Sequence, residues 1–211
     1  MSAPDPQSTF PPGFFDRSDT DDGGFYVPPR LVTHIDDAAI EAVGDLYREM
    51  GLTGQVLDLM SSWISHFHAK PERLTALGMN AQELAANPMA DEWVVHDANA
   101  DPELPFGDGV FDAAVCCVSV DYLVRPLDVF GELVRVLRPG SPFVCTFSNR
   151  CFPTKAVRGW LMADHAGRAE IVAEYFRRTP GWGEPVIDQR IPLGLRSDPL
   201  TAVWARTAGA S

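Results

Sequence analysis

The sequence predicts an α/β domain built on a mostly parallel sheet of about seven strands. Three observations carry this prediction. Short apolar, strand-like runs alternate with amphipathic, helix-like segments over most of the 211-residue chain. The run at residues 111–120 is apolar almost throughout, which is typical of a strand covered by helices on both faces. Two strand-like runs close the chain, and they predict a C-terminal antiparallel hairpin.

The N-terminal residues differ in composition from the rest of the chain. Residues 1–29 are rich in Pro, Gly and Asp and end in two prolines, so we expect a flexible arm without regular structure. Residues 30–211 are expected to form a single domain, because the chain is short for two hydrophobic cores. Within it, residues 30–50 carry apolar side chains at helical spacing, with Thr33 or Asp36 available as the N-terminal cap.

The segments that follow alternate between strand-like and helix-like patterns. Gly51 and Gly54 separate the first helix from the first strand, and Pro139-Gly140 ends a later helix. Ligands of parallel sheets bind beyond the carboxyl ends of the strands, so the loops at that edge are the expected site. The expected strands are residues 55–60, 73–77, 92–96, 111–120, 143–147, 185–192 and 200–206, and the expected helices after the first are residues 81–86, 126–137 and 167–178.

Charge and hydropathy disfavour several classes of partner. The formal net charge is -12 and no Lys/Arg-rich run is present, which opposes nucleic-acid binding. No apolar stretch approaches the roughly 20 residues that span a bilayer. The N-terminal residues lack the basic and apolar regions of a signal peptide. We therefore expect a cytoplasmic protein that binds neither nucleic acid nor membranes.

The cysteines and histidines were considered as chemical sites. Three of the four cysteines lie in apolar runs and none has C-x-x-C spacing, so we expect reduced, structural thiols. His66 and His68 are separated by one residue, and His34 and His96 lie elsewhere in the chain. No third ligand follows at a recognised spacing, so we expect no metal site.

The most specific motifs lie in residues 97–140. The letters LPF at residues 104–106 are followed by Asp108 and by FD at residues 111–112, and ELVRVLRPG occupies residues 132–140. In sequence and spacing, this region resembles the methyltransferase type 11 family of class I S-adenosylmethionine-dependent enzymes. The resemblance implies the Rossmann-like class I methyltransferase fold, with helices on both faces of the sheet, and S-adenosyl-L-methionine as cofactor.

The first strand departs from the family pattern just where the cofactor would approach. Asp58 lies in the matching strand motif, but Met60-Ser61-Ser62-Trp63 replaces the family's glycine-rich turn. Glycines there let backbone amides approach the cofactor closely, and simple nicotinamide binding is disfavoured by the same absence. Ser61 and Ser62 can donate hydroxyl hydrogen bonds to the cofactor's carboxylate, whereas Trp63 can instead fill the pocket.

Two further strand ends complete the expected cofactor site. At the end of the second strand the family places an acidic residue on the ribose hydroxyls, but this chain has Gly78 there, and we expect Asn80 to substitute more weakly. After the third strand, Asp97 matches the acid that reads the adenine amino group in the family, and Ala98 follows it. Asp58, Ser61, Ser62, Asn80, Asp97 and Ala98 are therefore the residues expected around the cofactor.

Polar residues after later strands are candidates for the acceptor side. His66 is a candidate proton acceptor, and Asp121 and Tyr122 lie where the fold faces its acceptor substrate, although a helix cap and a rim aromatic explain them equally well. Asn149 and Arg150 follow the fifth strand, and Arg150 either holds an anionic acceptor or forms an ordinary salt bridge.

The sequence leads to one main hypothesis and two alternatives. The main hypothesis is a methyltransferase acting on a small-molecule acceptor. The first alternative is a noncatalytic binding protein that has kept the fold and lost the glycine-rich loop, since one fold hosts several functions. The second is a metal-dependent enzyme that uses the histidines.

Overall fold

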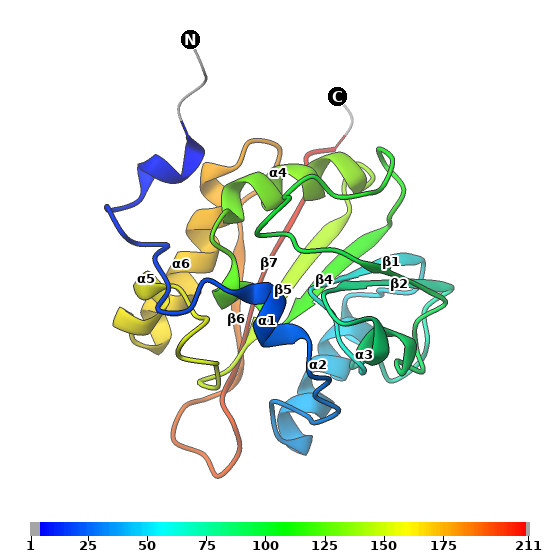
Figure 1. Ribbon diagram of the computed structural model, residues 1–211. Coiled ribbons are helices and arrows are strands. Elements are labelled where there is room, and N and C mark those ends of the chain that lie inside the picture. The colour runs from blue at the N-terminus through cyan, green and yellow to red at the C-terminus, as the bar shows by residue number, and fades with distance from the viewer. Residues whose placement is uncertain (1–4, 210–211) are drawn as a thin grey trace.

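The computed structural model describes residues 5–209. One seven-stranded sheet has the order β3-β2-β1-β4-β5-β7-β6 (Figure 1). Strands β1 to β5 run parallel, and β7 is antiparallel to both β5 and β6. The predicted sheet and its C-terminal hairpin are therefore confirmed. The strands are β1 (Gln55–Leu59), β2 (Arg73–Gly78), β3 (Glu92–Val95), β4 (Ala113–Cys117), β5 (Pro142–Phe147), β6 (Val186–Ile191) and β7 (Leu200–Arg206).

The helices begin and end close to the residues that the sequence predicts. Asp36 caps α2 by accepting a hydrogen bond from the Ala39 N–H at 2.9 Å, which decides between the two expected caps. Four short helices, η1, α1, η2 and α5, were not predicted. The helices are η1 (Pro6–Thr9), α1 (Asp22–Tyr26), α2 (Asp37–Glu49), α3 (Ala81–Ala85), η2 (Val120–Tyr122), α4 (Pro126–Val136), α5 (Arg158–Met162) and α6 (His165–Arg178).

The sheet separates two apolar clusters because alternate strand residues face opposite sides. On one face, Leu57, Ala114 and Cys116 pack against side chains of α4 and α6. On the other face, Val56 and Val115 pack against α2. The helices therefore cover both faces of the central strands, as the apolar β4 segment predicts.

Strand β4 is shorter than its apolar run. Residues 111–120 were expected to form one strand, but β4 contains only Ala113–Cys117. Val118 adopts a left-handed backbone with φ of 49°, which ends the extended conformation, and Phe111 forms only an isolated bridge with Leu137. Apolar composition alone does not reveal either change in backbone.

Residues 60–72 form the connection between β1 and β2, and this connection contains no helix. A parallel connection in such a sheet usually carries a helix that packs on one face. Here Phe67 takes that place, with its ring centroid 4.6 Å from that of Tyr47 on α2. The face on the α2 side is thus covered partly by an irregular segment.

The arm is more regular than predicted. Its described part contains η1 and α1, and it packs along the domain (Figure 1). Phe10 belongs to the apolar cluster beneath α6, and the Gln7 side chain donates a hydrogen bond to Asp128 of α4 at 3.0 Å. The expectation of an irregular arm is wrong for these residues because local composition does not report their contacts with the distant domain.

All four cysteines are free thiols, as predicted. Burial raises the pKa of the Cys117 thiol to about 12, so this cysteine stays protonated and weakly reactive at neutral pH. Among the helices of residues 5–209, none is both long enough and apolar enough to cross a bilayer.

Candidate functional site

A cavity lies at the carboxyl edge of the parallel strands. Its walls come from residues 60–62 after β1, 78–80 at the end of β2, 96–99 after β3 and 118–119 after β4. Arm residues close part of it. The sequence predicts a ligand site at this edge of the sheet. We call this cavity the main cavity.

The turn after β1 keeps a left-handed backbone without glycine. Met60 has φ of 56°, a conformation that side chains disfavour and glycine adopts freely. The Ser61 N–H donates to the Leu77 carbonyl at 2.7 Å, which draws the turn across the end of β2. A Cβ at Gly78 would lie only 2.2 Å from the Ser61 carbonyl oxygen. An acidic residue therefore does not fit at position 78 while the turn has this course.

The two predicted serines donate to carboxylates of the protein. Ser61 Oγ donates to Asp58 Oδ2 at 2.7 Å, and Ser65 Oγ donates to the same oxygen. Ser62 Oγ donates to Glu83 Oε2 at 2.6 Å. Asp58 does not line the main cavity, and burial raises the pKa of its carboxyl to about 6 although both serine hydrogen bonds lower it. Asp58 thus stabilises the turn after β1 without lining the cavity.

The arm is attached at the end of β2, next to the position at which the sequence resemblance led us to expect the ribose. Asn80 Oδ1 accepts the N–H groups of Gln82 and Glu83 and so caps α3, while its Nδ2 donates to the Tyr26 and Val27 carbonyls at 2.8 and 3.0 Å. Glu83 Oε1 accepts the Arg30 N–H at 2.6 Å. The amide expected to pair with a ribose is therefore bonded to the arm in this structure.

Asp97 and Ala98, which were expected at the adenine end, both line the main cavity, and their contact with a cofactor stays a prediction. Asp97 Oδ1 accepts the Asn99 N–H at 2.9 Å and the Ala100 N–H at 3.2 Å, which fixes the turn after β3. Asn99 in turn donates to the Tyr122 carbonyl at 3.0 Å. The Asp97 side chain thus stabilises the turn after β3 and also forms part of the cavity wall.

The three predicted catalytic residues do not come together. Tyr122 lines the main cavity, and its hydroxyl accepts the Phe152 N–H at 2.9 Å. His66 and Asp121 are not among the lining residues. Burial lowers the pKa of His66 to about 4 and raises that of Asp121 to about 8, so both are neutral near pH 7. Their catalytic roles stay predictions, without the placement expected for them.

A second cavity adjoins the first and shares part of its wall with it, including His34, Tyr122 and Phe152. Arg150 lies in its wall, but Asn149 lines neither cavity. The Arg150 Nε donates to Asp198 Oδ1 at 2.9 Å, which is the ordinary salt bridge that the sequence left open. Substrate contact by these two residues stays a prediction.

Comparisons with known proteins agree with this geometry. Residues 51–145 match the family model described as a methyltransferase domain. A segment of 72 residues is 39% identical to a ubiquinone/menaquinone biosynthesis C-methyltransferase, UbiE, of Roseobacter denitrificans. The match covers 33% of this chain and only 27% of that protein.

Solved structures match over most of the chain. A 1,6-didemethyltoxoflavin-N1-methyltransferase from Burkholderia thailandensis is 19% identical, with a TM-score of 0.57 over 82% of this chain and 80% of that one. A methyltransferase from Aquifex aeolicus gives 15% identity and a TM-score of 0.57 over 82% and 94% of the two chains. The fold is therefore that of the Rossmann-like class I methyltransferases, and the family model matches the part of the chain from residue 51 to residue 145.

The methyltransferase fold also hosts other reactions. The [4+2]-cyclase SpnF is 14% identical, with a TM-score of 0.58 over 87% of this chain and 90% of that one. A match at this identity carries the fold alone. The activity of the present chain must therefore be argued from its own residues.

Several residues that line the main cavity were not predicted from the sequence. Glu83 could have been found, because Asn80-x-x-Glu83 has the spacing of a capping box. Tyr26, Arg30 and His34 lie in or next to the arm, and nothing local in the sequence indicates that they line the cavity. Their placement depends on contacts between distant segments.

Proposed function

We propose that this protein is an S-adenosylmethionine-dependent methyltransferase that acts on a small-molecule acceptor. The observation that carries the proposal is the main cavity, whose walls come from the ends of four strands in a class I methyltransferase fold. The residues present fit the cofactor at the turn after β1, because Met60 keeps the left-handed backbone of a glycine turn. When bound, the cofactor supplies a methyl group on a sulfonium, an electrophile that needs alignment more than activation.

The residues of the chain divide the work in this proposal. Asp97 and Ala98 hold the adenine end. Asn80 holds the ribose end. Ser61 and Ser62 lie at the turn beside the amino-acid end, where their hydroxyl oxygens accept hydrogen bonds while donating to carboxylates of the protein. Tyr122 contacts the acceptor from the wall that the two cavities share.

A noncatalytic binding protein is the second candidate, and one observation favours it. Arm carbonyls already accept hydrogen bonds from the Asn80 amide. The backbone N–H of Arg30 already donates a hydrogen bond to the Glu83 carboxylate. A cofactor would have to displace these contacts or bind beside them. A fold that keeps its sheet while the arm fills the ribose end would bind some other ligand.

Thermal unfolding with and without S-adenosylmethionine and S-adenosylhomocysteine separates the two candidates. We expect both ligands to stabilise the protein, by about 2.7 kcal/mol at 100 times the dissociation constant. Calorimetric titration then gives the affinities. No stabilisation at millimolar ligand would reject the methyltransferase and favour the binding protein.

Asp97→Ala is expected to weaken S-adenosylhomocysteine binding by about tenfold or more, because a charged hydrogen-bond partner is worth roughly 1.5–3 kcal/mol. Since Asp97 also fixes a turn, Asp97→Asn is the matched control. It keeps an oxygen for the two backbone N–H groups but loses the charge. We expect Asn to restore stability and not affinity. Wild-type affinity in either folded variant would contradict the adenine role.

Met60→Gly is expected to change the free energy of unfolding by less than about 1 kcal/mol, because relief of the left-handed backbone offsets the loss of partly buried side-chain packing. We also expect tighter S-adenosylhomocysteine binding, since the side chain leaves the cavity wall. Met60→Leu is the control, because it keeps a similar volume and the backbone strain. Chemical denaturation and calorimetry measure both effects. Weaker binding by the glycine variant would show that the Met60 side chain supports the site.

A further inference from the structure

The irregular connection at residues 60–72 starts in the wall of the main cavity and then crosses to α2. Without a helix, it depends on side-chain contacts for its course. Asn87 Nδ2 donates to the Ser62 carbonyl at 3.1 Å and to Ser65 Oγ at 2.8 Å, and Phe67 packs on Tyr47. The next residue, His68, extends its imidazole to the outer side of α2.

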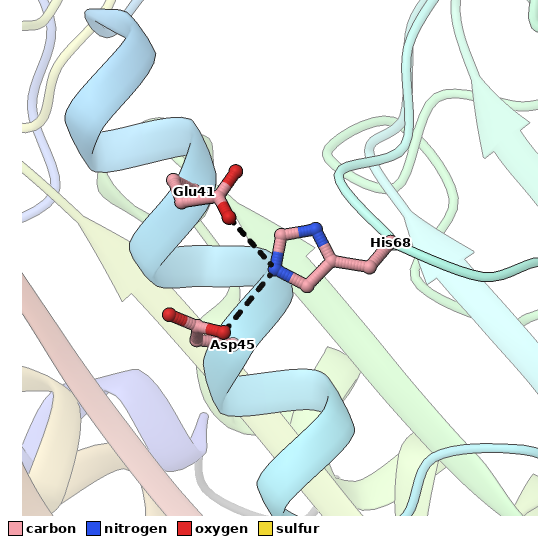
Figure 2. A group of neighbouring side chains, drawn as sticks. All are labelled: Glu41, Asp45 and His68. Carbon is pink, nitrogen blue, oxygen red and sulfur yellow. Dashed lines mark ion pairs between the residues drawn. The ribbon is translucent and has the colours of Figure 1, made fainter.

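His68 faces two carboxylates that lie one helical turn apart on α2. Its Nε2 is 3.3 Å from Asp45 Oδ1 and 3.6 Å from Glu41 Oε1, and Figure 2 shows the ring pointing to both. The three ligand atoms all lie within 4.8 Å of one another. Two carboxylates and one imidazole thus face a common point.

The two distances are too long for good charge-assisted hydrogen bonds and suit a bound ion. Charge-assisted N–H···O bonds measure about 2.7–2.9 Å. Zinc–ligand bonds are about 2.0–2.2 Å, and a tetrahedron with such bonds has edges of roughly 3.3–3.6 Å. Two of the three ligand–ligand distances, Nε2–Oδ1 at 3.3 Å and Nε2–Oε1 at 3.6 Å, match that spacing, and the two carboxylate oxygens lie within 4.8 Å of each other.

Gly44 lies beneath the imidazole and gives an independent reason for its position. A Cβ at residue 44 would lie 2.6 Å from Cε1 of His68 and 2.8 Å from both ring nitrogens. Glycine inside a helix costs about 0.5–1 kcal/mol relative to alanine. A methyl group at residue 44 would therefore displace the His68 ring, and glycine at this position of α2 leaves room for it.

We propose that Glu41, Asp45 and His68 bind a divalent transition-metal ion of the zinc type. Imidazole and carboxylate ligands suit Zn²⁺, and two carboxylates balance its charge. The ion fixes residues 60–72 to α2 and so steadies the turn that carries Ser61 and Ser62. Its role is structural, and it does not depend on the function proposed for the main cavity.

Arg48 competes for the same carboxylate. Its Nη2 lies 2.6 Å from Asp45 Oδ1, the oxygen that also faces His68. The Arg48 side chain is 65% exposed, so its guanidinium can move into water at little cost. Metal binding displaces this surface ion pair, and removal of Arg48 therefore strengthens the site.

Titration of tag-free protein with Zn²⁺ or Co²⁺ tests the proposal. We expect one ion per chain, a higher unfolding temperature, and a Co²⁺ spectrum without a thiolate charge-transfer band, which separates this site from the cysteines. His68→Ala should weaken binding by about tenfold or more, or about 1.4 kcal/mol. Glu170→Gln removes an exposed carboxylate of α6 that is not part of this cluster, and should leave the affinity unchanged.

Two further variants move the affinity in opposite directions without removing a ligand. Gly44→Ala displaces the His68 ring and should weaken binding by about tenfold, within the range found for residues that orient metal ligands. Arg48→Gln should tighten it. The proposal is overturned if wild type shows no saturable binding, or if His68→Ala binds the ion as tightly as wild type. Either result would leave an exposed histidine–carboxylate contact only.

Discussion

Asp22→Asn is expected to detach the arm from the domain. Asp22 is 5% exposed and lies between two cations. Its carboxylate accepts two hydrogen bonds from Arg17, at 3.0 and 2.9 Å, and its Oδ1 lies 3.1 Å from Nζ of Lys155. Lys155 is fully buried, so loss of the Asp22 charge removes its buried counterion and leaves only the more exposed carboxylate of Asp19 beside the ammonium.

Asp22→Asn is expected to lose much stabilisation energy, but release of the arm limits the loss of global stability. Removing one partner of a buried ion pair costs about 3–5 kcal/mol. Because the arm itself covers Lys155, its release returns the ammonium to water without unfolding the sheet. We therefore expect faster proteolysis within residues 5–29 and a smaller change in global stability. Release also frees the Asn80 amide and Glu83, which ties arm docking to the main cavity.

Asp19→Asn is the matched control. Asp19 Oδ2 lies 3.0 Å from the same Nζ of Lys155, but its side chain is 36% exposed. An exposed ion pair contributes about 0–1 kcal/mol, so this variant should keep the arm docked. Equal protease sensitivity of the two variants would contradict the argument, because only burial distinguishes them.

We expect protonation of the Asp22 carboxylate to release the arm in acid. Burial raises the pKa of Asp22, but hydrogen bonds from Arg17, Lys155 and Asn99 outweigh it, so the pKa lies below its usual range. The unfolded value is about 3.9. The stabilisation is therefore complete above that pH and is lost as the pH falls through the lower, folded pKa. Proteolysis at low pH by an acid-active protease measures it.

Regular elements were predictable because their signals are local. Helix α4 begins with Pro126 and ends before Pro139-Gly140, and its apolar stripe faces the sheet. The C-terminal hairpin has the bounds expected for its last strand. Each of these elements is determined by side chains within a few positions of one another.

The departures arise from contacts between distant segments. Asn80 lines the main cavity, but the arm carbonyls that bind its amide lie more than 50 residues away in sequence. From the sequence alone, Gly78 marks the loss of the family's acidic residue. The structure shows that the Ser61 carbonyl leaves no room for a side chain at this position. The sequence shows no third ligand near His68 at a recognised spacing, and the two carboxylates that face its ring, Glu41 and Asp45, come from α2 earlier in the chain. Spacing along the chain cannot reveal these pairs.

Asp121→Asn is expected to stabilise the protein at neutral pH. The Asp121 side chain is 2% exposed, and its Oδ2 accepts no hydrogen bond within the described chain. Burial raises the pKa of this carboxyl to about 8, although a hydrogen bond from its own backbone and the charge of Arg168 lower it. Between the unfolded value of about 3.9 and the folded value, the folded state therefore binds more protons.

The proton bound by Asp121 in the folded state makes the free energy of unfolding depend on pH. Stability falls as the pH rises through this window, by up to about 1.4 kcal/mol per pH unit, and the slope ends near the folded pKa. Asparagine has the shape of the protonated acid without its titration, so the variant should lose this slope. Asp58→Asn is a useful comparison, because the pKa of Asp58 is about 6 and its contribution should end near that pH. Urea denaturation from pH 4 to 9 measures all three proteins.

The same variant tests the catalytic role predicted from the sequence. Asp121 does not line the main cavity and is mostly protonated at pH 7, so we expect Asp121→Asn to bind S-adenosylhomocysteine as wild type does. Once an acceptor is in hand, turnover should also persist. A variant that is more stable, binds the cofactor normally and yet loses turnover would instead identify the buried carboxyl as a group that the reaction needs. In that case the acid is kept at a cost in stability, as strained and unpaired groups at functional sites often are.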